Sequence, residues 1–188
     1  NNYGLYVDFI DAIYFAVANG ADVISMSLGG SSYSTSFEEA VNFAVNNGVP
    51  VFASAGNDDV SNLTDPSYPA SFVNAISVGA MSPCGLRKTK TTCDGEFNWG
   101  SNYGNLDFIT PGTRIYTADI TGSGGYASGN YTPSFNGTSA ACPFAAGVAA
   151  LALSVDPTLT PQQIRTILQN GSADAGESGY DAETGFGR

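Results

Sequence analysis

The sequence contains no histidine, and its charged residues are few and mostly of one sign. Six lysines and arginines stand against 17 aspartates and glutamates, giving a net charge of −11, and charged residues fill only 12% of the 188 positions. The missing histidine removes the commonest general base and metal ligand from the chain. The scarcity of basic residues argues against nucleic acid and against an anionic membrane surface as partners.

Cysteines and long apolar runs are also scarce. The three cysteines fit no zinc pattern, but Cys84 and Cys93 are spaced for a local disulfide in a secreted protein. No run of 18 apolar residues and no signal peptide is visible, so we expect no membrane-spanning helix. Hydrophobic residues still make up 43% of the chain, which favours one folded domain over a disordered acidic tail.

Apolar periodicity predicts alternating helices and strands. Helices are expected over residues 4–19, 36–47, 139–154 and from Thr160 onward, with strands over 23–28, 49–54, 75–80 and 106–109. Ser36 with Glu39, and Thr160 with Gln163, read as capping boxes. Strands that are nearly continuous in apolar residues predict an α/β fold with a mostly parallel sheet flanked by helices.

Three further segments have a distinctive composition. Residues 139–154 are apolar nearly all round, which predicts a central buried helix. Residues 121–130 are rich in glycine and serine and should form a flexible loop or a small hairpin. Residues 81–103 carry Arg87, Lys88 and Lys90 beside two cysteines and are expected to form a surface excursion.

The stretch from Phe135 to Pro143 has the residues for nucleophilic chemistry. A serine at the start of a buried helix, here Ser139, lies close to unpaired backbone N–H groups and to the positive end of the helix dipole. That placement can stabilise an oxyanion formed when the serine attacks a carbonyl. The alternative is that Thr138 or Ser139 merely caps the helix.

A second polar position ends a predicted buried strand. In Ser54-Ala55-Gly56-Asn57 the asparagine stands where a parallel sheet presents its ligand-binding loops. The alternative is an ordinary turn formed by Asn57 with Asp58.

Taken together, these stretches resemble the subtilisin-like serine peptidases, in the family's order from about Leu5 to Arg188. The resemblance is carried by residues 22–30, 54–57, 68–70, 110–112, 136–143 and 185–187. It implies a three-layer subtilisin-like fold in which residues 1–188 are the nucleophile-bearing C-terminal portion of a single catalytic domain. That domain is incomplete without an upstream segment.

The resemblance implies a serine endopeptidase that hydrolyses peptide bonds by acyl transfer, with a role for each matching residue. Ser139 would be the nucleophile, Asn57 the side-chain donor of the oxyanion hole, and Thr138 its neighbour and helper. The walls of the cleft for protein or peptide substrates would be Ser27, Leu28, Gly29, Gly30, Ser54, Ala55 and Gly56. The glycines would let a substrate pair there as an added strand, and the Tyr68–Pro69 bond is a candidate for the cis form.

Other family features are absent or altered. The family's aspartate and histidine would come from an upstream segment or a partner chain, and without that segment a strand edge and apolar surface should be exposed. No cofactor is required for the chemistry, although structural calcium is common in the family, and we expect a secreted protein. Ala140, Cys142 and Phe144 are unusual for the family; Cys142 should be a buried free thiol.

Several alternatives stay open at this stage. Sedolisins use a Glu/Asp pair with serine, so Asp8 and Asp11 are candidates, although that branch has aspartate where Asn57 stands and a solvated helix face explains both. A catalytically inactive binding domain is the second alternative. Three acidic residues follow Asn57 and should lie near the mouth of the first specificity pocket: Asp58, Asp59 and Asp65. They suggest cleavage after lysine or arginine by charge pairing. The alternative roles for these carboxylates are calcium ligation or a solvated loop. Asn62, Asn130 and Asn170 begin glycosylation sequons, but such triplets are common by chance and do not discriminate between these functions.

Overall fold

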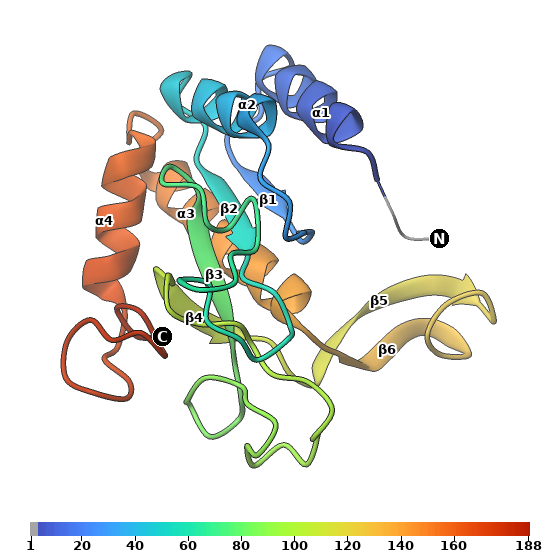
Figure 1. The fold of residues 1–188 in the computed structure, drawn as a ribbon. Helices are drawn as coiled ribbons and strands as arrows, with labels where there is room; N and C mark the ends of the chain where they lie inside the picture. Colours follow the sequence, from blue (N-terminus) through green and yellow to red (C-terminus); the bar gives the residue numbers. More distant parts are fainter. Residues whose placement is uncertain (1–3) are drawn as a thin grey trace.

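The computed structural model describes residues 4–188, which form a sheet with helices on both faces and a separate hairpin (Figure 1). In chain order the elements are α1 (Tyr6–Ala18), β1 (Ile24–Met26), α2 (Thr35–Asn46), β2 (Val51–Ser54), β3 (Ile76–Met81), β4 (Phe108–Pro111), β5 (Ile115–Gly122), β6 (Gly129–Phe135), α3 (Thr138–Val155) and α4 (Pro161–Gly171).

The main sheet has the strand order β1-β2-β3-β4, and every neighbouring pair is parallel. All four strands were expected from their apolar runs, with boundaries that differ by a few residues. The prediction of an α/β fold with a parallel sheet flanked by helices is therefore confirmed. Because parallel strands all end at the same edge, the loops after β1 and β2 meet the turn before α3.

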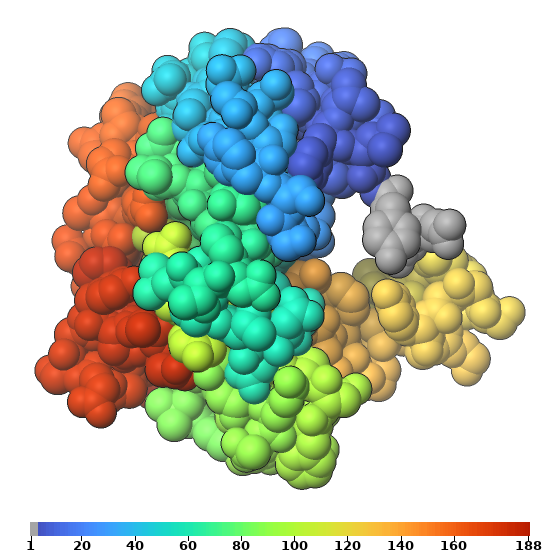
Figure 2. All heavy atoms as spheres, viewed as in Figure 1, coloured from blue at the N-terminus to red at the C-terminus, as the bar shows by residue number. Residues whose placement is uncertain are grey.

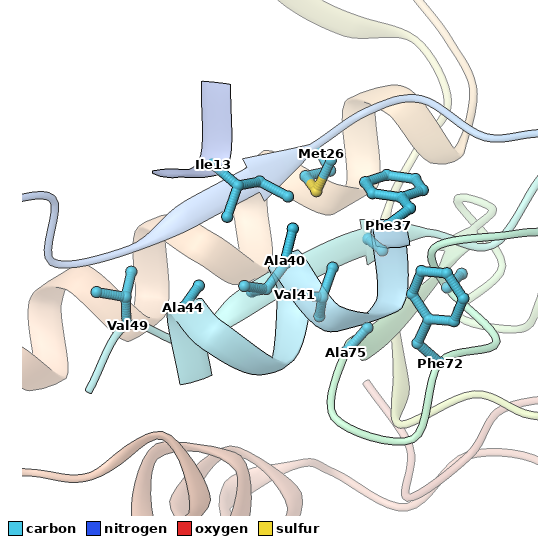
Figure 3. Packing of buried hydrophobic residues seen from close by; sticks show 12 residues of the cluster. Ile13, Met26, Phe37, Ala40, Val41, Ala44, Val49, Phe72 and Ala75 are labelled. Carbon is cyan, nitrogen blue, oxygen red and sulfur yellow. The ribbon is translucent and has the colours of Figure 1, made fainter. Parts of the chain in front are cut away.

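Alternate side chains of β2 enter two apolar layers on opposite faces of the sheet. Val51 and Ala53 contact the layer formed with α1 and α2, and Phe52 contacts the layer formed with α3 and α4. Figure 3 shows the first layer, where Phe37 of α2 and Phe72 pack edge to face with ring centroids 5.6 Å apart. The small residues of α3 lie against all four strands, which fixes the start of α3 relative to the sheet.

Helix ends confirm one predicted cap and correct another. Thr160 and Gln163 form the expected capping box of α4, with Pro161 in the first turn. The predicted box of Ser36 with Glu39 is wrong: the N-cap of α2 is Ser34, whose hydroxyl accepts from the backbone N–H of Phe37 at 3.3 Å. Ser34 has the extended backbone that an N-cap needs, whereas Ser36 lies inside the first helical turn.

The segment expected as a flexible loop or small hairpin is part of a longer hairpin. Strands β5 and β6 pair antiparallel, so the glycine-rich residues form only its tip. Tyr116 and Tyr131 stack across the pair with ring centroids 5.6 Å apart. Figure 2 shows the hairpin projecting from the body of the molecule.

The expected surface position of the basic patch is wrong for two of its three residues. Lys88 is fully buried, and its Nζ lies 3.3 Å from the equally buried carboxylate of Asp94. Arg87 is buried as well and pairs with Asp59 at 2.7 Å, while Lys90 is exposed. Composition alone did not reveal that these charges have partners, which is what permits their burial.

One face of α3 is exposed, contrary to the expectation of a helix buried on every side. Its alanines pack on the sheet, but large apolar side chains on the other face are exposed: Phe144, Val148, Leu151 and Val155. Within residues 4–188, β1 also pairs only with β2. The predicted open strand edge and apolar surface are therefore present. In length and hydropathy α3 reaches the range of membrane-spanning helices, but its contacts are those of a core helix.

Two local predictions about covalent geometry are confirmed. Cys84 and Cys93 form a disulfide with their Cα atoms 6.2 Å apart, and the Tyr68–Pro69 peptide bond is cis. The disulfide closes the loop of residues 84–93, which follows β3.

Candidate active site

Ser139 is the second residue of α3 and is half-buried. Gly137 is the N-cap, with φ +113°, a conformation in the region that favours glycine. The Ser139 hydroxyl lies 3.5 Å from the carbonyl oxygen of Ser27, and the Ser27 hydroxyl donates to the Ser139 carbonyl at 2.8 Å. The nucleophile candidate is thus held at a helix N-terminus beside the end of β1.

Thr138 fixes the orientation of Asn57. The backbone N–H and the hydroxyl of Thr138 both donate to Oδ1 of Asn57, at 2.8 and 3.0 Å. The same hydroxyl accepts from the backbone N–H of Gly56 at 3.2 Å. Because Oδ1 has two donors, the amide cannot turn over without placing its NH₂ group against them. Thr138, which is buried, therefore connects the predicted oxyanion donor to the start of the helix.

Two hydrogen-bond donors converge beside Gly137. The position that a Cβ atom would take on Gly137 lies 3.5 Å from both Nδ2 and Oδ1 of Asn57 and 3.5 Å from the backbone nitrogen of Ser139. Among the described residues, neither donor has a hydrogen-bond acceptor. Paired donors at the positive end of a helix are the arrangement that stabilises a developing oxyanion. A side chain at position 137 would occupy the same space.

A cavity of about 280 Å³ begins at Ser139 and runs between the loops after β1 and β2. Five of the predicted cleft residues line it with Asn57, Thr138 and Ser139: Leu28, Gly29, Gly30, Ser54 and Gly56. Ser27 does not line the cavity but contacts Ser139 directly. Ala55 is fully buried against Leu106 and Ile109, so its side chain cannot form part of the wall.

The acidic residues after Asn57 separate into two groups. Asp58 and Asp65 are exposed and line the cavity. Asp59 is paired with Arg87, so the expectation that its carboxylate faces the cavity with the other two is wrong. The buried guanidinium of Arg87 draws it toward the loop that follows β3.

Sequence reasoning missed the asparagines that support this loop. Asn102 is buried, and its Oδ1 accepts from the backbone N–H of Asp58 at 2.9 Å. Its Nδ2 donates to Oδ1 of Asn62 at 3.1 Å, and Asn62 in turn donates to the carbonyl of Ala55 at 2.9 Å. In sequence Asn62 was only part of a sequon. Nothing in the pattern of single residues links it to Asn102, 40 positions later.

Cys142 is a buried free thiol, as expected. It lies one helical turn after the start of α3, with its sulfur 3.5 Å from the Ser25 hydroxyl. Burial raises the pKa of the thiol above its ordinary value. The thiol therefore stays protonated at neutral pH and behaves as a small apolar side chain.

The other candidates from sequence lie apart from this arrangement. Asp8 and Asp11 are exposed on α1, which packs on the opposite face of the sheet from α3. Residues 4–188 contain no group of three or more histidine, cysteine, aspartate or glutamate side chains placed to hold a metal ion. Structural calcium therefore stays a prediction, since backbone and amide carbonyl oxygens can also bind this ion.

Comparisons with known proteins show the family of the chain. The sequence profile of the Subtilase family matches residues 1–187. Subtilisin DY of Bacillus licheniformis is 38% identical over 178 residues, which cover 94% of this chain and 59% of the relative. Subtilisin E of Bacillus subtilis is 36% identical over 178 residues, covering 94% of this chain and 42% of the relative. The chain thus spans less than two thirds of these relatives.

Solved structures support the same assignment. A cold adapted subtilisin-like serine proteinase superimposes with a TM-score of 0.79 at 29% identity, covering 98% of this chain and 61% of that one. A lanthipeptide protease, at 24% identity and a TM-score of 0.81, shows the fold alone, over 98% of this chain and 63% of its own. The subtilisin-like fold predicted from the motifs is confirmed. The chain belongs to the subtilase family.

Proposed function

We propose that this chain carries the nucleophile of a serine endopeptidase. In the proposed reaction the Ser139 hydroxyl attacks the peptide carbonyl and passes its proton to a base. The C–N bond breaks, the protonated amine leaves, and water then hydrolyses the acyl ester. Asn57 Nδ2 and the Ser139 backbone N–H stabilise the oxyanion formed on the carbonyl oxygen. The proposal is carried by the convergence of these two donors, 3.5 Å from one point beside Gly137.

We propose that an aspartate and a histidine from outside residues 1–188 complete the site, on an upstream segment or on a partner chain. The chain has no histidine, and nothing described near Ser139 is a general base: the nearest acceptor to its hydroxyl is a carbonyl at 3.5 Å. A serine hydroxyl without a base is a weak nucleophile. The exposed edge of β1 and the apolar face of α3 support a segment packing there.

The test is peptide hydrolysis by the enzyme assembled with the segment that supplies aspartate and histidine. Ser139→Ala should lower kcat by more than about 10⁴-fold, because the nucleophile is lost. Ser154→Ala is the matched control, since it makes the same change at the exposed far end of α3 and should leave kcat unchanged. Equal kcat values for Ser139→Ala and wild type would refute the proposal.

We further propose a preference for lysine or arginine before the scissile bond. Asp58 and Asp65 line the 280 Å³ cavity next to Ser139 without a basic partner among the described residues. A cationic side chain in the cavity would gain roughly 1 kcal/mol from each carboxylate near the surface. The net charge of −11 would also attract a positively charged substrate to the molecule.

Matched peptides ending in arginine or phenylalanine test this preference. Asp65→Asn should lower the ratio of kcat/KM for arginine over phenylalanine by about fivefold, a change of roughly 1 kcal/mol. Asp8→Asn removes the same charge on the remote helix α1 and should leave the ratio unchanged. A wild-type preference for phenylalanine that does not change with salt would contradict the charge pairing.

The second candidate is a binding domain without activity. The exposed apolar face of α3 favours it, because such a face also suits a permanent protein partner. It predicts a stoichiometric complex in which Ser139→Ala binds the partner as wild type does and in which wild type cleaves no peptide. Peptide hydrolysis by wild type and by Ser139→Ala therefore distinguishes the two functions: an endopeptidase cleaves only as wild type, and a binding domain cleaves in neither form.

We propose a secreted protein. The Cys84–Cys93 disulfide supports this location, because disulfides persist in oxidising compartments. Free-thiol titration of protein recovered from outside the producing cells should find one thiol per unfolded chain. Three thiols would contradict the proposal.

A further inference from the structure

The turn between β6 and α3 is held at Asn136, three residues before Ser139. Its Oδ1 accepts from the backbone N–H of Arg114 at 2.6 Å, and its Nδ2 donates to Oε1 of Glu96 at 2.9 Å. Both ends of this amide are therefore engaged, one by the residue before β5 and one by a different loop. Gly137 is fixed by a backbone hydrogen bond to the carbonyl of Gly112 at 2.8 Å.

Glu96 is itself held in place by Trp99 and by Lys88, which lies within the loop that the Cys84–Cys93 disulfide closes. Its Oε2 accepts from the indole N–H of Trp99 at 2.7 Å. Its backbone carbonyl accepts from Nζ of buried Lys88 at 2.6 Å, and Lys88 is paired with buried Asp94. The carboxylate thus projects from an anchored segment rather than from a free chain end.

The same hollow contains this carboxylate and the oxyanion donor. Glu96, Trp99, Asn136 and Gly137 line a space of about 530 Å³ with Asn57. The hydrogen bond between Glu96 and Asn136 lies at the edge of the site but touches no reacting atom. It can act on the reaction only through the position of the turn that leads into Ser139.

We propose that Glu96 is a positioning residue for Ser139, acting through Asn136; the proposal rests on the proposed peptidase function. Catalytic groups must be held in a narrow range of positions, and small displacements cost large factors in rate. The carboxylate of Glu96 links its own anchored segment to the turn that leads into Ser139. Loss of that link lets Ser139 and its N–H shift relative to Asn57.

A carboxylate is the group that fits this place, because both of its partners are donors. An amide at position 96 could accept from Trp99 or from Asn136, and its own NH₂ would then face the other N–H group. Asn136 cannot turn over to relieve this conflict, since its Oδ1 already accepts from Arg114. Glu96→Gln therefore disrupts the link with almost no change in volume.

The experiment uses the assembled enzyme, with kcat and KM measured separately for one peptide. Glu96→Gln should lower kcat about tenfold with KM within about twofold, because alignment is lost and binding is not. Glu39→Gln is the matched control: it makes the same charge change at an exposed position of α2. The kcat and KM of this control should equal those of wild type.

The decisive variant is Glu96→Gln combined with Asn136→Asp. The new aspartate accepts from Arg114 and from the new glutamine, whose carbonyl accepts from Trp99, so every donor has an acceptor again. Asn136→Asp alone places a second carboxylate against that of Glu96 and should lower kcat at least tenfold. The double variant should return kcat to within about threefold of wild type, whereas independent effects would multiply to about a hundredfold loss.

Each outcome decides the proposal. Rescue of kcat in the double variant supports it. A kcat that is unchanged in Glu96→Gln, or multiplied losses in the double variant, overturns it while leaving the proposed function intact. Wild-type enzyme that cleaves no peptide overturns the proposed function and this inference with it.

Discussion

The hydroxyl of Thr138 is the feature whose removal tests the site most informatively. Thr138→Val keeps the shape of the buried side chain and deletes only the group that donates to Asn57 at 3.0 Å and accepts from Gly56 at 3.2 Å. Thr138→Ser keeps the hydroxyl and deletes a methyl group. The pair of variants therefore separates hydrogen bonding from packing at one buried position.

The magnitude follows from the two hydrogen bonds. Each contributes about 1 kcal/mol net, so Thr138→Val should lower the free energy of unfolding by about 2 kcal/mol. Thr138→Ser should lower it by about 1 kcal/mol through the lost methyl group. Asn57 keeps one of its two Thr138 donors in Thr138→Val, so we expect a partial loss of oxyanion stabilisation, about tenfold in kcat, or roughly 1.4 kcal/mol.

The assays are peptide hydrolysis for kcat and KM and denaturant unfolding for stability. The expected pattern is a tenfold lower kcat for Thr138→Val, an unchanged kcat for Thr138→Ser and unchanged KM in both. Equal kcat values for the two variants would refute the reasoning, because the hydroxyl would then have no role in orienting Asn57.

Three further predictions concern the buried groups around the site. Lys88→Met leaves the Asp94 carboxylate buried without a cation and should lower the free energy of unfolding by about 3–5 kcal/mol. Lys90→Met, at an exposed position, should change this free energy by no more than about 0.5 kcal/mol. Similar losses of stability in the two variants would contradict the buried ion pair. Gly137→Ala places a methyl group 3.5 Å from both oxyanion donors at φ +113° and should lower kcat more than KM; an active alanine variant would show that the oxyanion lies elsewhere. Because the pKa of the Cys142 thiol is raised by burial, its contribution to stability is complete below the unfolded thiol pKa and is lost as pH rises through the folded one; Cys142→Ser should remove this alkaline loss in unfolding curves, and the same loss in the variant would assign it to another group.

The sequence predicted the elements with local signals and the residues within contiguous motifs. The capping box of α4 and the four apolar strands were found because each is encoded within a few neighbouring residues. Ser139, Thr138 and Asn57 were predicted as site residues in the same way, since two short motifs contain them, and the structure brings them together.

The supports of the site were not predictable from such signals. Asn102 accepts from the backbone N–H of Asp58 from 44 residues away, and Glu96 holds Asn136 from 40 residues away, so only the folded chain reveals these contacts. Lys88 looked like a surface charge because a buried cation differs from an exposed one only in its partners. The exposed face of α3 was misjudged for a related reason: periodicity reports that a helix is apolar, not what covers it.

The central claim, that Ser139 is an activated nucleophile beside the Asn57 donor, is tested most directly by active-site labelling. The assembled enzyme is treated with a fluorophosphonate, and the adduct is located by mass spectrometry of its peptides. The account predicts one adduct per chain, on Ser139, with slower labelling in Thr138→Val and none in Ser139→Ala. An enzyme that cleaves peptides but is labelled at another residue, or equally in Ser139→Ala, would contradict it.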